Sequence, residues 1–342
     1  MCSAEGGRTL DNNLVSGKKR ALAYGIGAIL VLSIPFLFIN IQYLILVACF
    51  IEIYAIGVSG LDVLFGYSGQ ISMGHAAFFA IGAYGSVLIH KYFGIPVFFT
   101  MFIGAILGCA VAAILAYPAS KLVFHFLSLA TIAFGEIVYG LLIHSPGRIT
   151  GNSVGLYTDS VSIFGFELDT YTRFFYFGLV LMVLFLLAKK MLIGSRTGRA
   201  FIAIRENTHA ADGMGINVRK YKIIAFALSG FYMAFAGAMY AHLTRYISPD
   251  TFTNKQSVMF ITMLLFGGTG SLFGPIVGCI TLMSITELLR SAQNYMTLIY
   301  SILMLLVIVA LPGGLYGMVR DIILSRRARR LRALEEGGRP HA

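Results

Sequence analysis

Charged side chains are too scarce along this chain for it to fold as a water-soluble domain. Of its 342 residues, 58% are hydrophobic and 12% are charged, whereas a soluble domain of average composition carries about a quarter charged residues. A chain with half the usual supply of charge cannot cover a water-facing surface of this size. The composition therefore excludes soluble proteins of one or two domains and indicates an integral membrane protein.

The apolar residues gather in ten segments separated by short polar connections. A helix that crosses a bilayer needs about 20 apolar residues, so we expect an all-α polytopic membrane protein with about 8–10 transmembrane or half-spanning helices. The shortest segment, 256–266, must either cross the membrane itself or be accompanied by a different arrangement of the neighbouring spans. The segments are 21–39, 41–60, 70–90, 96–117, 121–143, 172–188, 222–242, 256–266, 272–290 and 295–311.

Basic residues give the chain a net charge of +11, and 19 of the 26 Lys and Arg fall in residues 1–20, 189–222 and 313–342. Lys and Arg concentrate in cytoplasmic segments of membrane proteins. An even number of apolar segments separates these regions, so all three can lie inside the cell, where anionic lipid explains their charge without a nucleic-acid partner.

These patterns divide the chain into a cytoplasmic N-terminus, a transmembrane domain and a basic cytoplasmic tail. We expect these parts at residues 1–20, 21–318 and 319–342, with a cytoplasmic loop at 190–221 and an extracytoplasmic loop at 144–171. The basic N-terminus leads into apolar residues 21–39 without a small-residue cleavage site, so we expect that segment to be retained as a span.

The sequence offers no catalytic, metal-binding or cofactor-binding pattern. Its four cysteines are scattered, without disulfide or metal-ligand spacing. Gly17-Lys18-Lys19 lacks the upstream glycine and the following Ser or Thr of a phosphate-binding loop. We therefore expect no enzyme activity, no cofactor and no ATP hydrolysis by this chain itself.

A six-residue motif occurs twice at a spacing of 201 residues: Leu64-Phe65-Gly66-Tyr67-Ser68-Gly69 and Leu265-Phe266-Gly267-Gly268-Thr269-Gly270. Glycine-interrupted apolar segments at matching positions of a repeat mark the central pathway of many transporters. The alternative is a tight cytoplasmic turn between two helices in each half. On the first interpretation, the candidate path residues are Gly66, Ser68, Gly69, Gln70, Ser72, His75, Gly267, Gly268, Thr269 and Gly270.

Two further features of the apolar segments carry a structural and a functional interpretation. Glu136, inside segment 121–143, either forms a structural hydrogen bond to another helix or belongs to the path or its gate. His75 has the same two interpretations.

Small residues allow close helix packing, which we expect at Gly74, Gly82, Gly85, Gly230 and Gly237.

The basic loop predicts one amphipathic helix of about 16 residues over 199–215, with apolar Phe201, Ile202 and Ile204. It is too short and too charged to span a membrane. It suits docking into a groove of a partner protein, or alternatively lying in the lipid interface.

Several motifs together resemble the permeases of branched-chain amino acid ABC transporters, of the LivM type. The resemblance covers about residues 50–318, with the motifs in the family's order. They are Arg199 to Ala211, Gly215-Ile216-Asn217, Lys222, Ala225-Phe226 and Ala236 to Ala241; Gly66 to His75 and Ile81 to Tyr84; Thr131 to Glu136; Thr150-Gly151-Asn152 with Gly155-Leu156; Phe266 to Pro275; and Leu311 to Leu315.

The resemblance implies that the loop couples the permease to an ATPase. ABC permeases generally carry an E-A-A-x-x-x-G element that contacts the ATPase, and the corresponding positions here read His209-Ala210-Ala211-x-x-x-Gly215. The Glu is absent, and Arg205 and Glu206 just upstream are candidates to replace it. The implied coupling residues are Arg199, Arg205, Glu206, His209, Ala210, Ala211 and Gly215.

The resemblance further implies the subunit of a heteromeric importer in the bacterial inner membrane, with both termini cytoplasmic. Its partners would be a second permease, two cytoplasmic ATP-binding subunits and an extracytoplasmic binding protein that delivers a branched-chain or related amino acid. Urea and amide importers share this family. The competing class is a stand-alone secondary transporter or channel in which Glu136 and the histidines relay protons; a membrane enzyme has only scattered Glu and His in its favour.

Overall fold

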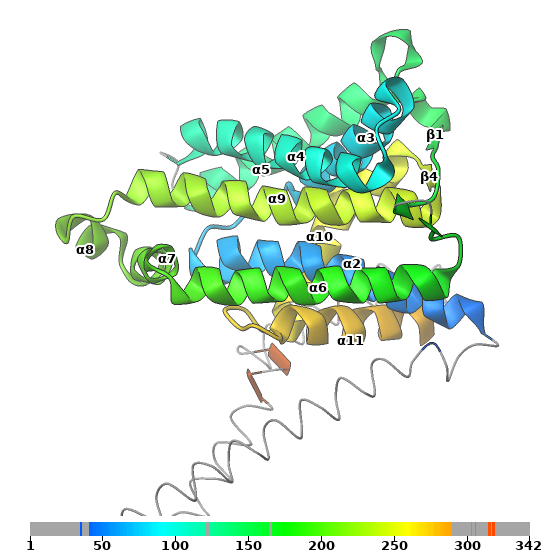
Figure 1. The fold of residues 1–342 in the computed structure, drawn as a ribbon. Coiled ribbons are helices and arrows are strands. Elements are labelled where there is room, and N and C mark those ends of the chain that lie inside the picture. Colours follow the sequence, from blue (N-terminus) through cyan, green and yellow to red (C-terminus); the bar gives the residue numbers. More distant parts are fainter. Residues whose placement is uncertain are drawn as a thin grey trace, which may run out of the picture.

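The computed structural model describes residues 41–120, 124–163 and 166–288, with single positions at 35, 302, 305, 314, 315, 317 and 318. These residues form a bundle of long helices with almost no sheet, which confirms the predicted all-α membrane class (Figure 1). The predicted spans 21–39 and 295–311, the N-terminus and the basic tail lie outside the described residues.

The long elements are α2 (Gln42–Asp62), α3 (His75–Phe93), α4 (Val97–Ala119), α5 (Phe124–Ile143), α6 (Tyr171–Gly194), α9 (Val218–Thr244), α10 (Asn254–Gly267) and α11 (Gly274–Leu288). A five-residue π-helical turn, η1 (Val63–Tyr67), extends α2. The short helices are η2 (Pro146–Arg148), η3 (Asn152–Val154), α7 (Arg196–Glu206), α8 (Thr208–Gly213) and η4 (Pro249–Phe252).

Five of the described helices are long and apolar enough to cross a membrane. They are α2 with η1, α4, α5 from Phe126, α6 and α9. Helix α10 has 14 residues, which at 1.5 Å per residue spans about 21 Å of a hydrocarbon core that is about 30 Å thick. Helix α10, which contains predicted segment 256–266, is thus too short to cross this core by itself.

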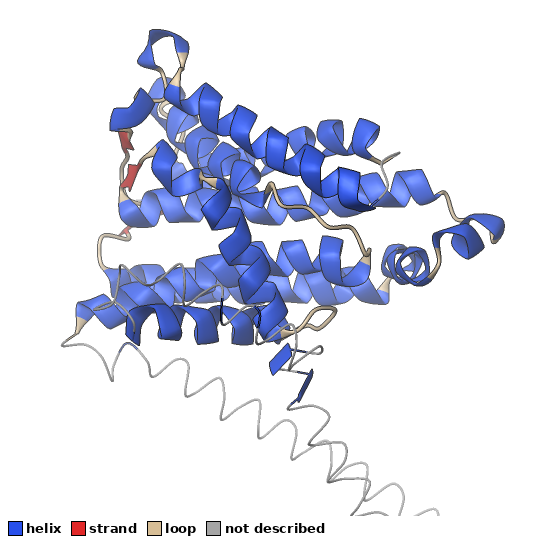
Figure 2. Ribbon diagram, turned by 180° about the vertical axis from the view of Figure 1, so that it is seen from behind, coloured by secondary structure: helices blue, strands red, loops and turns tan. Residues whose placement is uncertain are grey.

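Helix α9 is the central element of the bundle and packs against α2, α3 and α4. Figure 1 shows α3, α4 and α5 on one side of α9, and α2, α6 and α11 on the other. The view from behind shows the same two groups (Figure 2). Helix α10 contacts α2, α3, α5 and α11 and so connects the groups.

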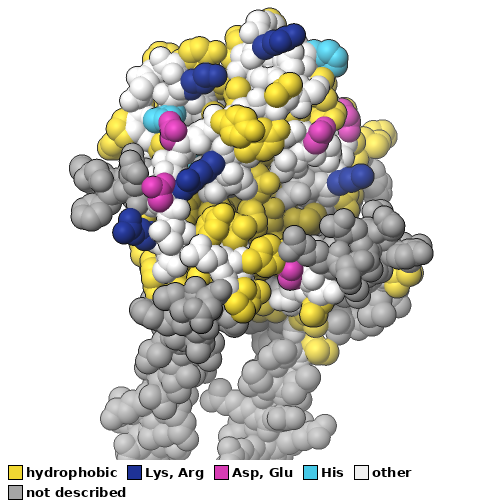
Figure 3. Space-filling model, turned by 90° about the vertical axis from the view of Figure 1, so that its right-hand side faces the viewer, with side chains coloured by type: hydrophobic (Ala, Val, Ile, Leu, Met, Phe, Trp, Pro, Cys, Tyr) yellow, Lys and Arg dark blue, Asp and Glu magenta, His cyan; other side chains and the backbone are white. Residues whose placement is uncertain are grey.

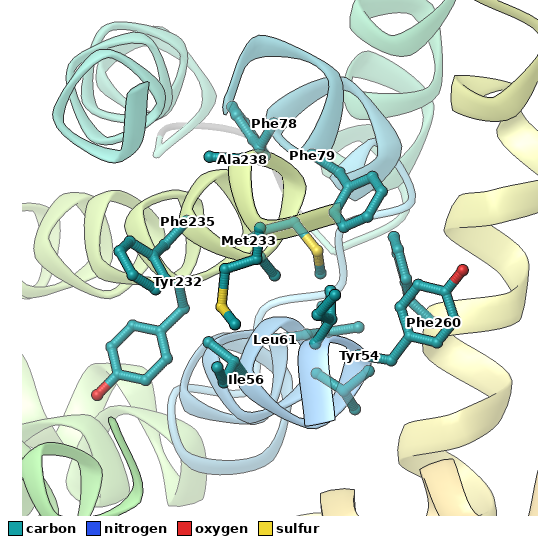
Figure 4. Close-up of a cluster of buried hydrophobic side chains, with 14 of the residues drawn as sticks. Tyr54, Ile56, Leu61, Phe78, Phe79, Tyr232, Met233, Phe235, Ala238 and Phe260 are labelled. Carbon is teal, nitrogen blue, oxygen red and sulfur yellow. The ribbon is translucent and has the colours of Figure 1, made fainter. Parts of the chain in front are cut away.

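Aromatic side chains fill the core between these helices. The Phe79 ring lies 5.3 Å from that of Phe260 in an edge-on arrangement, and Tyr54 lies 5.6 Å from Phe260 in the same way, which are favoured geometries for aromatic pairs. Figure 4 shows this cluster, with labelled residues from α2 (Tyr54, Ile56, Leu61), α3 (Phe78, Phe79), α9 (Tyr232, Met233, Phe235, Ala238) and α10 (Phe260).

Glycines bring α3 and α9 into backbone contact, as predicted. A Cβ atom at Gly82 would overlap the carbonyl oxygen of Ala234, and one at Gly237 would overlap that of Phe79. Since apolar burial does not drive helices together in lipid, such close packing carries much of the association. The predicted close packing is also found at Gly74, where a Cβ would overlap the Thr131 carbonyl oxygen, and at Gly230, where it would overlap Ala112 Cβ. It is wrong for Gly85, where a Cβ would make only ordinary van der Waals contacts.

Short strands connect the helices at the end of the bundle opposite α7 and α8 (Figure 1). Strands β1 (Leu156–Tyr157) and β4 (Tyr246–Ile247) pair antiparallel, as do β2 (Ser162–Ile163) and β3 (Phe166–Glu167). The predicted 144–171 loop contributes three of these strands. Figure 3 views this end and shows acidic and basic side chains scattered between apolar patches.

Candidate functional site

The two glycine motifs of the repeat are in direct contact. The first forms η1 and the residues after it, and the second forms the end of α10 and the following turn. A Cβ atom at Gly66 would overlap the backbone nitrogen of Gly270. The closing glycines of the motifs, Gly69 and Gly270, have φ values of +71° and +70°. Matching positions of the repeat therefore share the left-handed conformation that favours glycine.

The backbone after the first motif leaves helical geometry and stays buried. Residues 68–74 form no helix, and Ser68, Gln70 and Ser72 are 2%, 6% and 0% exposed. Gln70 Nε2 donates to Ser68 Oγ at 2.8 Å. Ser72 Oγ has no partner among the described residues. Non-helical backbone at membrane depth occurs where it is buried in protein or lines a wet cavity.

Helix α3 begins inside the bundle, at His75, and not at residue 70 as the apolar pattern predicts. His75 is fully buried, and its Nε2 atom lies 2.7 Å from Ser229 Oγ on α9. Ser257 Oγ on α10 accepts a hydrogen bond from the backbone nitrogen of Ala76 at 2.8 Å. Side chains from two neighbouring helices thus hold the first turn of α3.

The second motif packs tightly around the start of α11. Gly267 and Gly268 are buried, while Thr269 and Gly270 are half-buried. A Cβ atom at Gly267 would overlap the carbonyl oxygen of Gly274. The two glycine motifs therefore meet in one place. Of the other path residues predicted from sequence, His75 lies on α3 with its side chain against Ser229 of α9, and Glu136 lies on α5.

Glu136 is an exposed residue on α5 and not part of the glycine turns. Its Oε1 atom accepts a hydrogen bond from Asn254 Nδ2 on α10 at 2.5 Å. The neighbouring Gly135 lies against Asn254 and near Gly74, the residue before α3. The carboxylate therefore lies close to the N-terminal end of α3.

The basic loop folds into two helices, so the prediction of one 16-residue helix is wrong. Helix α7 ends at Glu206, and Asn207 Oδ1 accepts hydrogen bonds from the backbone nitrogens of His209 and Ala210 at 3.0 Å each. Asn is among the strongest N-cap residues and a weak helix former. Asn207 therefore ends α7 and begins α8.

The predicted coupling residues divide into exposed and inward-facing groups. The exposed residues are Arg199, Arg205, Glu206, His209, Ala210 and Gly215, whereas Ala211 is buried. Met214, just after α8, is 85% exposed. A groove of about 580 Å³ lies between this segment and α9, lined by Ser120, Thr208, His209, Asp212, Gly215, Ile216, Asn217, Val218, Arg219 and Lys222.

Arg205 differs from the other predicted coupling residues because it reaches back to the glycine turns. Its guanidinium donates a hydrogen bond to the carbonyl oxygen of Gly66. A Cβ atom at Gly69 would lie 3.2 Å from Arg205 Cγ, and one at Gly270 would lie 3.1 Å from its Nη1. Arg205 thus touches both repeats at their matching glycines.

A buried ion pair that the sequence does not predict lies beside these turns. Lys189 Nζ lies 2.7 Å from Asp62 Oδ2, and both side chains are fully buried. In the sequence, Lys189 is one of the basic residues of 189–222, and Asp62 lies two residues after apolar segment 41–60. The available signal was an acidic residue two positions before the repeated motif, at the end of a span.

A polar cavity of about 460 Å³ opens at the opposite end of the bundle. Two polar contacts line it, between His90 Nε2 and Asp159 Oδ2 at 3.2 Å and between Arg245 Nη2 and Asp169 Oδ1 at 2.9 Å. Thr158, Ser160 and Val97 complete its lining. Among the described residues, no three His, Cys, Asp or Glu side chains are grouped to hold a metal ion.

Comparison with known proteins identifies relatives over most of the chain. Residues 43–312 match the family model described as branched-chain amino acid transport system / permease component. The high-affinity branched-chain amino acid transport system permease protein LivM of Escherichia coli K12 is 31% identical over 317 residues, covering 86% of this chain and 74% of LivM.

More distant relatives include a second type of importer. The probable branched-chain amino acid transport permease protein LivM of Methanocaldococcus jannaschii is 25% identical and covers 81% of this chain and 94% of its own. The autoinducer 2 import system permease protein LsrC of Yersinia enterocolitica is 30% identical over 115 residues, 32% of each chain. No solved structure matches this chain.

Proposed function

Because the chain belongs to the family of branched-chain amino acid transport permease components, we propose that it is the transmembrane permease subunit of an ABC importer for branched-chain or related amino acids. It resides in the inner membrane with both termini in the cytoplasm. A second permease, two cytoplasmic ATP-binding subunits and an extracytoplasmic binding protein complete the importer. The observation that carries the proposal is the family match over residues 43–312.

The α7–α8 segment is the docking site for an ATP-binding subunit. It extends beyond the ends of the neighbouring long helices (Figure 1) and carries exposed Met214 beside the groove that His209 and Gly215 line. An exposed apolar side chain next to a groove suits a protein partner better than bulk water. Movement of the ATPase reaches the spans through this segment.

The translocation path runs along the face where Glu136 meets the start of α3. An exposed carboxylate on an apolar span is expensive against lipid, so this face is covered by the second permease or lines a wet path. The negative charge of Glu136 attracts the ammonium group of a zwitterionic amino acid at this face.

Reconstitution of the complete importer in proteoliposomes tests this function. We expect uptake of radiolabelled leucine to require ATP inside, the binding protein outside and the second permease, and to be insensitive to an ionophore. Uptake by this chain alone that an ionophore abolishes would instead establish a secondary transporter. Titration of the binding protein with leucine, isoleucine, valine, urea and an amide identifies the substrate class separately from the transport mechanism.

Variants of the same complex test the docking segment and the path. We expect Ala210→Arg and Gly215→Arg to lose copurification of the ATP-binding subunits, whereas Val154→Arg, at the opposite end and 77% exposed, retains it. We expect Glu136→Gln to reduce uptake about tenfold or more, because Gln keeps an oxygen that can accept from Asn254 but loses the negative charge that attracts the ammonium group. Normal ATPase association in both Arg variants would refute the docking site, and normal uptake by Glu136→Gln would refute the path.

A further inference from the structure

The buried pair Asp62–Lys189 lies at the end of the bundle where α7 joins the spans. Asp62 is the last residue of α2, and Lys189 lies five residues before the end of α6, which α7 follows. Two charges withdrawn from water persist only when each is paired and its remaining hydrogen-bonding capacity is used. Ionisable groups inside membrane spans therefore point to a function.

The remaining bonds of this pair hold the second glycine turn. Asp62 Oδ1 accepts a hydrogen bond from the backbone nitrogen of Gly270 at 2.7 Å. Lys189 Nζ donates to the carbonyl oxygen of Ser271 at 3.1 Å. The two charged side chains thus hydrogen-bond to adjacent residues of the second turn. Lys189 Nζ also lies 5.7 Å from the centre of the Tyr67 ring, which belongs to the first turn.

Arg205 connects the same turns to α7. It donates to the Gly66 carbonyl oxygen, which lies one helical turn after Asp62. It also contacts Gly69 and Gly270, the matching left-handed glycines of the two repeats. A side chain larger than hydrogen at either glycine would push against Arg205, so the motif leaves room for this arginine.

We propose that Asp62, Lys189 and Arg205 are positioning residues that transmit movement of α7 to both glycine turns. The ion pair holds the second turn to α2 and α6, and Arg205 is the contact through which α7 acts on the turns. Because each repeat contributes one turn, a single displacement of α7 reaches both halves of the permease. This inference rests on the proposed ATPase coupling and adds the route by which the coupling enters the spans.

The decisive measurement is the number of amino acids imported per ATP hydrolysed by the reconstituted importer. We expect Arg205→Gln to retain the ATP-binding subunits and ATP hydrolysis but to lower this ratio about tenfold, the size of a lost hydrogen bond to a charged group. Arg148→Gln, which changes an exposed arginine of η2 outside the docking segment, serves as the matched control and keeps the ratio of the unchanged importer.

Two results with Arg205→Gln would overturn the inference. An unchanged ratio would mean that Arg205 transmits nothing, and loss of the ATP-binding subunits would make Arg205 an ATPase contact instead. If the unchanged importer itself shows no ATP-driven uptake, that result refutes the proposed function as a whole and does not test the role of Arg205. The two failures are thus distinguishable.

The ion pair is tested by removing one charge and then both. We expect Lys189→Met to reduce the yield of assembled permease, because it leaves the Asp62 charge buried without its partner. Asp62→Asn with Lys189→Met restores assembly but lowers the import ratio. If the double variant imports as many amino acids per ATP as the unchanged importer, the ion pair only stabilises the fold and does not transmit the movement of α7. If the double variant does not assemble, the Arg205→Gln result decides.

Discussion

Gly82 and Gly85 lie less than one turn apart on α3, yet their surroundings differ sharply. A Cβ atom at Gly82 would overlap the Ala234 carbonyl oxygen, which belongs to the rigid backbone of α9 and cannot move aside alone. A Cβ atom at Gly85 would lie 3.5 Å from Leu107 Cδ1, an ordinary contact. Of these two glycines of α3, only Gly82 is required by the contact with α9.

We predict that Gly82→Ala destabilises the permease by about 1–3 kcal/mol, the usual effect of overpacking a core. Thermal unfolding of the purified protein in detergent measures this loss. Gly85→Ala is the matched control and should leave the stability unchanged or slightly higher, since Ala favours helix over Gly. Equal melting temperatures for the two variants would mean that α3 and α9 are not in backbone contact.

Four of the five glycines predicted to pack closely do so, and Gly85 does not. The buried ion pair, by contrast, could not be predicted from sequence. Spacing along one helix indicates which small residues share a face, so the amino-acid pattern alone identifies Gly82 and Gly237 as packing positions. Asp62 and Lys189 are 127 residues apart, and each lies at a span end where charges are commonly solvated. Only the three-dimensional packing of α2 against α6 brings them together.

At the scale of elements, the break at Asn207 divides the basic loop into α7 and α8. The apolar pattern alone favours one continuous helix, because buried Phe201, Ile204 and Ala211 keep helical spacing across the break. The side chain of Asn207 outweighs this pattern by capping the next helix. Side-chain hydrogen bonds also outweigh the apolar pattern at the start of α3. There Ser229 of α9 and Ser257 of α10 bond to the first turn, which begins at His75.

We predict that Asn207→Ala frays α8 by removing both cap hydrogen bonds, a loss of about 1 kcal/mol. Hydrogen exchange of the α8 backbone amides should become faster by several-fold, and the ATP-binding subunits should dissociate more readily. Asn207→Ser retains a capping oxygen and should exchange like the unchanged protein. Unaltered exchange in Asn207→Ala would mean that packing of buried Ala211, and not the cap, holds α8.

At the scale of the whole molecule, the two ends of the helix bundle differ both in charge and in structure. One end carries α7, α8 and the basic residues of 189–222, and the other carries the short strands and a cavity lined by polar side chains. The +11 net charge could be located from sequence alone. Which helices surround α9 could not, because a span with apolar residues on all sides does not reveal its neighbours.

The orientation of the whole permease follows from this asymmetry and can be measured with two cysteine substitutions. Met214 and Tyr157 are 85% and 81% exposed at opposite ends of the bundle. By the preference of Lys and Arg for the cytoplasmic side, we predict that Tyr157→Cys reacts with a membrane-impermeant maleimide in intact spheroplasts. Met214→Cys should react only after the membrane is opened, and the unchanged chain reports labelling of its native cysteines. Labelling of Met214→Cys in intact spheroplasts would place α7 and α8 outside the cell and contradict both the orientation and the docking of an ATPase there.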